Sequence, residues 1–224
     1  MNIANWPLLE RPKEKLISFG AEKLSDAELI AVVLQSGVKG MDAMELARSL
    51  LVRFDGLRGL LAASRDDVCS VKGVGDSKFA RLGVIVELGN RCRLAALKNR
   101  SVLSGAKRTK EYLKAKYQGR DSEIFSCLFL DSQHQLIVAE ELFTGTIDGA
   151  AVYPREVVKK CLKYASAAVI FAHNHPSGIA EPSQADIAIT AKLKAALATI
   201  DVRVLDHLII GDPNITSLAE RGLL

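Results

Sequence analysis

Residues 173–186 of this chain read His173-Asn174-His175-Pro176-Ser177-Gly178-Ile179-Ala180-Glu181-Pro182-Ser183-Gln184-Ala185-Asp186. They directly follow the apolar run Ala167–Ala172, which predicts a buried strand. Side chains two positions apart at the end of a strand point to the same face, so the rings of His173 and His175 can reach one metal ion while Asn174 points away. The prolines and the glycine that come next predict a turn rather than more strand.

A carboxylate follows the two imidazoles at a spacing that suits a third metal ligand. Ser183 begins a predicted helix, and Asp186 lies in its first turn. Three protein ligands with one open position are the coordination of a catalytic zinc rather than a structural one. The same residues form an ordinary capping box, and the two interpretations are compatible because the cap can orient the carboxylate. Two of the four histidines of the chain lie in this short turn, which favours the metal.

The motif, His-x-His-Pro followed after six residues by Ser-x-x-Asp, resembles the JAMM motif of the MPN-domain metallopeptidases. The fuller string from His173 to Asp186 is similar to the bacterial RadC-like (UPF0758-type) proteins, and so is the segment Leu205–Gly211. The resemblance covers nearly the whole chain and has its specific motifs in the C-terminal half. It implies a Zn²⁺ ion held by His173, His175 and Asp186, and a role for Ser183 in stabilising the tetrahedral intermediate.

The resemblance also implies a glutamate on the first strand of the domain, as the general base that activates water. Glu123 begins the run 123–130, which reads as a mostly buried first strand, and its position matches that of the family's glutamate. Glu140 and Glu141, on the next predicted strand, are the alternatives. A solvated carboxylate is the commoner fate of a glutamate at a strand end. Geometry decides among them, because the base must come within hydrogen-bond reach of the water.

Together these residues predict hydrolysis of a peptide or isopeptide bond. Zinc makes water more acidic and polarises the carbonyl, Glu123 moves the proton to the leaving amine, and Ser183 donates to the developing oxyanion. The alternative is a DNA-binding, DNA-repair-associated protein whose metal site is structural or acts on nucleic acid. A zinc deaminase of nucleobases is disfavoured. That chemistry requires His-x-Glu and Pro-Cys-x-x-Cys, whereas this chain has His175 at the glutamate position and no cysteine pair.

A third histidine of interest, His207, precedes the apolar run Leu208–Ile210 and therefore lies near the start of a predicted strand. Such a residue packs near the sheet edge, supports the metal ligands, or contacts the substrate. We expect a supporting role and do not count His207 among the ligands.

Composition narrows the class of protein. With 224 residues, of which 49% are hydrophobic, the chain can form a real core in one large domain or two small ones. No segment reaches the ~18 uninterrupted apolar residues that a membrane span requires, and the N-terminus shows no apolar signal core. The four cysteines are scattered and form no Cys-x-x-Cys motif. We therefore expect a cytoplasmic, reduced protein without membrane contact.

The first hundred residues predict a helical domain, with helices near residues 25–35, 42–54 and 57–63 and a long one ending near 97. The turn before the long helix contains Gly73 and Gly75 and resembles the helix-hairpin-helix motif of DNA-binding proteins. Glycine amides at a helix start can hold a phosphate, and Lys72 and Lys78 add positive charge beside them. A plain helical hairpin with a glycine turn is an equal alternative.

Positive charge is concentrated at the predicted domain junction. Residues 91–120 hold ten Lys or Arg and one acid, a net charge of +9, so the rest of the chain carries −5 of the total of +4. This basic band is either a DNA-binding footprint or a solvated helix surface, because few aromatic residues interleave with the charges.

Residues 102–224 predict a second domain, distinct from the helical domain of residues 1–100. A helix at 109–117 precedes a hairpin of strands at 124–130 and 136–143. The elements expected after it are a helix at 154–164, a strand at 167–172, a helix at 183–198, a strand at 202–210 and a short strand at 215–218. This order predicts an α/β fold with a mixed, MPN/JAMM-like sheet flanked by helices, rather than a Rossmann fold.

Overall fold

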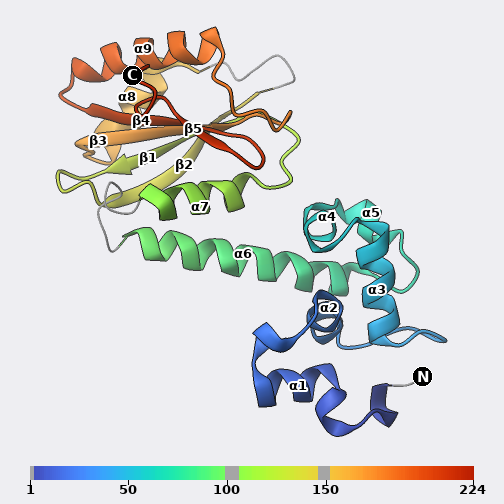
Figure 1. The fold of residues 1–224 in the computed structure, drawn as a ribbon. Helices are drawn as coiled ribbons and strands as arrows, with labels where there is room; N and C mark the ends of the chain where they lie inside the picture. Colours follow the sequence, from blue (N-terminus) through green and yellow to red (C-terminus); the bar gives the residue numbers. More distant parts are fainter. Residues whose placement is uncertain (1–2, 99–105, 146–151) are drawn as a thin grey trace. The chain divides into compact units, whose positions relative to one another are not determined.

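The computed structural model describes residues 3–98, 106–145 and 152–224 of the chain. They divide into two structural units, the first ending at Gly89 and the second running from Asn90 to Leu224, which Figure 1 draws as ribbons. The predicted domain boundary, between residues 100 and 102, lies outside the described residues. The second unit takes in the end of helix α6 (Asp76–Lys98), because Leu97 is buried in its core.

The first unit is helical, as its sequence predicts. Its helices before α6 are α1 (Pro12–Phe19), α2 (Asp26–Leu34), α3 (Ala43–Arg53), α4 (Leu57–Ala62) and α5 (Arg65–Cys69), with 3-10 turns at Ile3–Asn5, Leu8–Glu10 and Ala21–Lys23. Capping boxes at Ser25 and Asp42 begin α2 and α3. The core consists of fully buried aliphatic side chains that include Leu34, Leu46, Leu50, Leu60 and Val68. Among the described helices, none combines the length and apolar character that crossing a bilayer requires.

The second unit is built on one mixed sheet, which confirms the predicted fold class. Its described elements are α7 (Ala106–Tyr117), β1 (Ile124–Leu130), β2 (Leu136–Thr144), α8 (Pro154–Lys163), β3 (Ala168–Asn174), α9 (Gln184–Ala198), β4 (Arg203–Ile210) and β5 (Ile215–Ser217). The strand order is β2-β1-β3-β4-β5. The β3–β4 pair is parallel and the other pairs are antiparallel, so β3 occupies the centre of the sheet.

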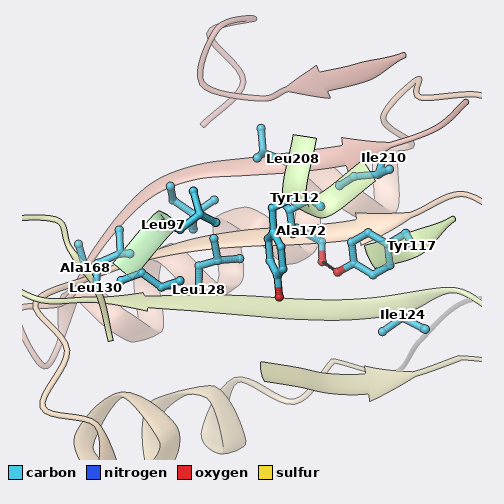
Figure 2. Close-up of a cluster of buried hydrophobic side chains, with 13 residues drawn as sticks. Leu97, Tyr112, Tyr117, Ile124, Leu128, Leu130, Ala168, Ala172, Leu208 and Ile210 are labelled. Carbon is cyan, nitrogen blue, oxygen red and sulfur yellow. Dashed lines mark hydrogen bonds between the residues drawn. The ribbon is translucent and has the colours of Figure 1, made fainter. Parts of the chain in front are cut away.

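Helices cover both faces of this sheet. On one face α7 packs over Leu128, Leu130 and Ile170, and Figure 2 shows the Tyr117 hydroxyl on this side donating a hydrogen bond to the carbonyl of Ala172. On the other face α8 and α9 bury Phe125, Cys127, Phe129, Val169 and Phe171. Because both faces are covered, every residue of β1 and β3 is buried. This explains why both strands are mostly apolar rather than alternating, apart from Ser126 in β1 and the polar end of β3.

Strand β3 extends two residues beyond its apolar run. His173 is paired with Phe125 of β1 and Ile209 of β4, and Asn174 is paired with Ile210. The strand is therefore longer than the predicted run 167–172. Pairing of His173 on both sides and of Asn174 with β4 keeps these polar residues extended. As a result, the first candidate ligand lies within the sheet and not in the turn that follows it.

Asn174 fastens the start of β1 to the end of β3. Its Oδ1 accepts a hydrogen bond of 2.8 Å from the Ile124 N–H, and its Nδ2 donates one of 3.0 Å to the Ser122 carbonyl. Only 4% of the Asn174 surface is exposed. The two bonds hold the backbone on either side of Glu123. The Asn174 side chain, which points away from the His173 side of the strand, therefore helps to position the segment that carries the candidate base.

We expect Asn174→Ala to lower the free energy of unfolding by about 1–3 kcal/mol, because the buried Ile124 N–H and Ser122 carbonyl lose their partner. Urea denaturation followed by circular dichroism measures the change. The control is Ser132→Ala, at an exposed turn position, which should cost less than about 0.5 kcal/mol. Equal stability of the two variants would contradict the role assigned to Asn174.

Candidate metal centre

Three side chains converge where β3 ends and α9 begins. The ligand atoms of His173, His175 and Asp186 all lie within 4.8 Å of one another. His173 Nε2 is 2.9 Å from His175 Nε2 and 3.1 Å from Asp186 Oδ1, and His175 Nε2 is 3.5 Å from Asp186 Oδ2. The His173 side chain is 1% exposed and that of His175 is 19% exposed. The cluster is therefore reached from the His175 side.

These separations suit the ligand shell of a zinc ion. Ligands bound at ~2.0–2.1 Å in tetrahedral geometry lie about 3.3 Å apart, and the three measured separations are 2.9, 3.1 and 3.5 Å. Nitrogen and carboxylate lone pairs repel each other at such distances unless a proton or a cation lies among them. Two imidazoles and one carboxylate also form a ligand set that catalytic zinc sites use. The residues present therefore fit the metal that the sequence predicts.

The loop after β3 orients His175. Its Nδ1 donates a 2.7 Å hydrogen bond to the Ile179 carbonyl, which leaves Nε2 facing the cluster. The loop turns at Gly178, whose φ of +80° is in the left-handed region that favours glycine. A hydrogen bond to Asp186 is the largest cause that raises the pKa of His175, and the charge of Glu123 adds to the effect. The charges that favour a proton here also favour a metal cation.

Asp186 is held by the capping box that the sequence predicts. Its Oδ2 accepts 2.7 Å hydrogen bonds from both the N–H and the hydroxyl of Ser183, and its own N–H donates to Ser183 Oγ at 3.1 Å. Burial alone would raise the pKa of Asp186, but the neighbouring imidazoles of His173 and His175 hold that pKa far below its usual range. The capping box thus orients a carboxylate that stays ionised, as a metal ligand must.

The three candidate bases occupy different surroundings. Glu123 is half-buried just before β1, and its charge acts on His175. Glu140 accepts a hydrogen bond from the Tyr164 hydroxyl and pairs with Lys160 at 2.8 Å. Glu141 pairs with Lys116 and Arg120, at 3.3 and 3.8 Å. Of the three, Glu123 is the carboxylate whose charge acts on a histidine of the cluster.

Behind His173, the buried side chains of His207 and Thr190 form further contacts in the core. His207 Nε2 lies 2.8 Å from His173 Nδ1, and its own Nδ1 lies 2.6 Å from Thr190 Oγ1. Burial, followed by the charge of nearby His173, lowers the pKa of His207 to about 3. Thr190 is not among the residues predicted from the sequence, although its place four residues after Asp186 puts both on one face of the helix.

The candidate DNA-binding turn lies in the first unit, and its basic side chains differ in exposure. Lys72 is exposed, whereas the Lys78 ammonium donates to the carbonyls of Gly73 at 2.8 Å and Gly37 at 3.2 Å. Gly73 has a φ of +94°, and a Cβ there would come within 2.0 Å of Val38 Cγ1. Lys78 and Gly73 thus join two neighbouring turns. DNA contact by this turn, including exposed Gly75, stays a prediction.

Several members of the basic band are paired within the second unit. Lys110 lies 2.8 Å from Glu220, and Lys114 donates to the Pro213 carbonyl at 2.9 Å. Lys116 and Arg120 share Glu141. These contacts offset part of the positive charge of residues 91–120, and DNA binding by the band also stays a prediction.

Comparison with known proteins agrees with the fold. Residues 103–223 match the model of the RadC-like JAB domain, and residues 3–80 match that of the UPF0758 N-terminal family. The chain belongs to the RadC-like UPF0758 family. A UPF0758 protein of Marinomonas sp. (strain MWYL1) is 54% identical over 224 residues, covering 100% of both chains, and one of Cellvibrio japonicus (strain Ueda107) is 53% identical over the same span.

The RadC-like match contains His173, His175, Asp186 and Glu123, so the whole cluster lies within one recognised domain. The glycine turn at residues 72–78 falls inside the UPF0758 N-terminal match. These family names state no activity. The case for a reaction therefore depends on the side chains of the RadC-like domain.

We expect Asp186→Asn to lose bound zinc while α9 survives, because the asparagine Oδ1 can still accept from the Ser183 N–H. Elemental analysis should find about one zinc per wild-type chain and none in the variant, with unchanged helical circular dichroism. Glu181→Gln is the matched control, since this exposed carboxylate pairs with Arg221 and should leave the metal in place. Full zinc content in Asp186→Asn would contradict a role for Asp186 as a metal ligand and would leave helix capping as its role.

Proposed function

We propose that this RadC-like protein is a zinc-dependent hydrolase of peptide or isopeptide bonds. The observation that carries the proposal is the convergence of His173 Nε2, His175 Nε2 and the Asp186 carboxylate within 4.8 Å, with the charge of Glu123 acting on the same cluster. Three ligands and a nearby carboxylate base are the parts that metal-assisted hydrolysis requires.

The side chains divide into ligands and proton carriers. His173, His175 and Asp186 hold the ion, which when bound polarises the scissile carbonyl and lowers the pKa of water from ~15.7 to about 7–9. The Glu123 carboxylate accepts a proton from water and passes it to the leaving amine nitrogen. The two bonds from Asn174 to the backbone on either side of Glu123 hold the segment that carries this carboxylate.

Ser183 is suited to stabilise the oxyanion because its oxygen is fixed while its proton can turn. The Asp186 N–H donates to Ser183 Oγ, and the hydroxyl proton is directed to Asp186 Oδ2. Rotation about the Cβ–Oγ bond redirects this proton without moving the oxygen. A donor of this kind contributes roughly 3 kcal/mol to transition-state stabilisation.

The bond class is the part of the proposal that needs a direct assay. The peptide assignment is supported by the resemblance to MPN-domain metallopeptidases, and activated water also attacks phosphodiesters. Zinc-loaded protein should be tested against internally quenched peptide libraries, isopeptide-linked peptides, and single- and double-stranded DNA. Cleavage of DNA alone would favour the nucleic-acid alternative, and cleavage of none of these substrates would contradict the hydrolase proposal.

We expect Glu123→Gln to keep its zinc and lose about 10²- to 10⁴-fold in kcat, because general acid–base catalysis contributes this much. Rates on the best substrate and zinc content by elemental analysis are measured together. Glu141→Gln is the control, since Glu141 pairs with Lys116 and Arg120 and should retain full activity. Loss of activity in Glu141→Gln but not in Glu123→Gln would show that the base is misassigned.

A further inference from the structure

A buried chain of hydrogen bonds runs from the back of His173 into the core. His173 Nδ1 lies 2.8 Å from His207 Nε2, His207 Nδ1 lies 2.6 Å from Thr190 Oγ1, and Thr190 Oγ1 lies 2.5 Å from the Asp186 carbonyl oxygen. His173, His207 and Thr190 are each at most 1% exposed. We call this set the Thr190–His207–His173 chain, and its proton positions follow from the acceptors at its ends.

The first proton is located by the Asp186 carbonyl. A carbonyl oxygen only accepts, so a hydroxyl oxygen 2.5 Å away must direct its single proton toward it. This is the i to i−4 bond that a threonine makes within a helix. Because the Thr190 hydroxyl already donates its one proton to the Asp186 carbonyl, its Oγ1 can only accept a hydrogen bond from His207 Nδ1. His207 must therefore carry a proton on Nδ1.

The second proton follows from the surroundings of His207. The rings of Phe125 and Phe171 lie edge-on to it, with centroids 5.4 and 6.0 Å away. Among the described residues, no carboxylate oxygen forms an ion pair with the His207 ring, and a positive charge buried without such a partner is costly. A neutral imidazole that is protonated on Nδ1 presents a lone pair at Nε2. His173 Nδ1 must then donate to it, and His173 Nε2 is left without a proton.

We propose that Thr190 and His207 are positioning residues that hold His173 in the tautomer whose Nε2 lone pair faces the metal. The inference rests on the metal site of the proposed function. The Thr190–His207–His173 chain of hydrogen bonds starts at the backbone carbonyl of Asp186, and the carboxylate of Asp186 is another ligand of that site. These hydrogen bonds therefore link a ligand on β3 to a ligand on α9. His175 has a separate acceptor, the Ile179 carbonyl. The two imidazole ligands are thus oriented independently.

The chemical identity of the acceptor affects the charge of the site. A ligand histidine often donates to a carboxylate, which adds a negative charge behind the metal. Here the acceptor is His207, which is neutral, so it fixes the tautomer of His173 without adding a negative charge. The charge of a zinc ion is then offset by Asp186 alone among the ligands and their partners, which preserves its strength as a Lewis acid.

Thr190→Val and Thr190→Ser test the inference in the full-length protein. Valine has nearly the shape of threonine but cannot accept from His207, whereas serine keeps the hydroxyl. We expect Thr190→Val to weaken zinc binding about 10- to 100-fold, and Thr190→Ser to stay within about threefold of the wild type. Competition with a chromophoric chelator measures the affinities, and circular dichroism establishes that each variant is folded.

A second experiment observes the histidine tautomers directly in the wild-type protein, so it does not depend on a variant that folds. Long-range ¹H–¹⁵N NMR of zinc-loaded, ¹⁵N-histidine-labelled protein should show protons on Nδ1 of both His173 and His207. A proton on His207 Nε2, or equal zinc affinity in folded Thr190→Val, would overturn the inference and leave the hydrolase proposal standing. Absence of zinc binding by the wild type would overturn both.

Discussion

The position of β3 between β1 and β4 is the constraint on which the rest of the second unit depends. With helices on both faces, the strand can carry polar side chains only at its end, and each must find a partner. The two-residue period of the strand sends His173 toward the α8 and α9 side and Asn174 to the other side. His173 lies against the other two candidate ligands, whereas Asn174 holds the backbone around Glu123. Two adjacent residues thus position both a ligand and the candidate base.

The side chains of the cluster are oriented by other groups of the same domain. Each candidate ligand is oriented by a different element: His173 by His207, His175 by the Ile179 carbonyl, and Asp186 by Ser183. These partners restrict ring and carboxylate rotation, so little reorganisation accompanies metal binding. Exposure increases from His173 to His175, which directs any substrate to the side of the loop that follows β3.

The first unit illustrates how a motif can be present while a residue within it has another role. The two-glycine turn is formed, and α6 begins directly after it at Asp76. The positive charge of Lys78, however, is directed at the carbonyls of Gly37 and Gly73, where burial lowers the pKa of the ammonium. A lysine in a glycine turn therefore serves here to join two turns, which spacing alone does not reveal.

The sequence by itself determined what depends on neighbours along the chain. The candidate ligands lie two and eleven residues apart around a loop and a capping box, and the helices and strands follow local periodicity, so all of these were predictable. Tertiary structure decided what depends on the pairing of distant strands. The β1–β3 register places Glu123 where its charge acts on His175, while Glu140 and Glu141 pair with lysines, and the β3–β4 register brings His207 behind His173. The physical reason is that these contacts join residues dozens of positions apart, and no local propensity specifies which strands become neighbours.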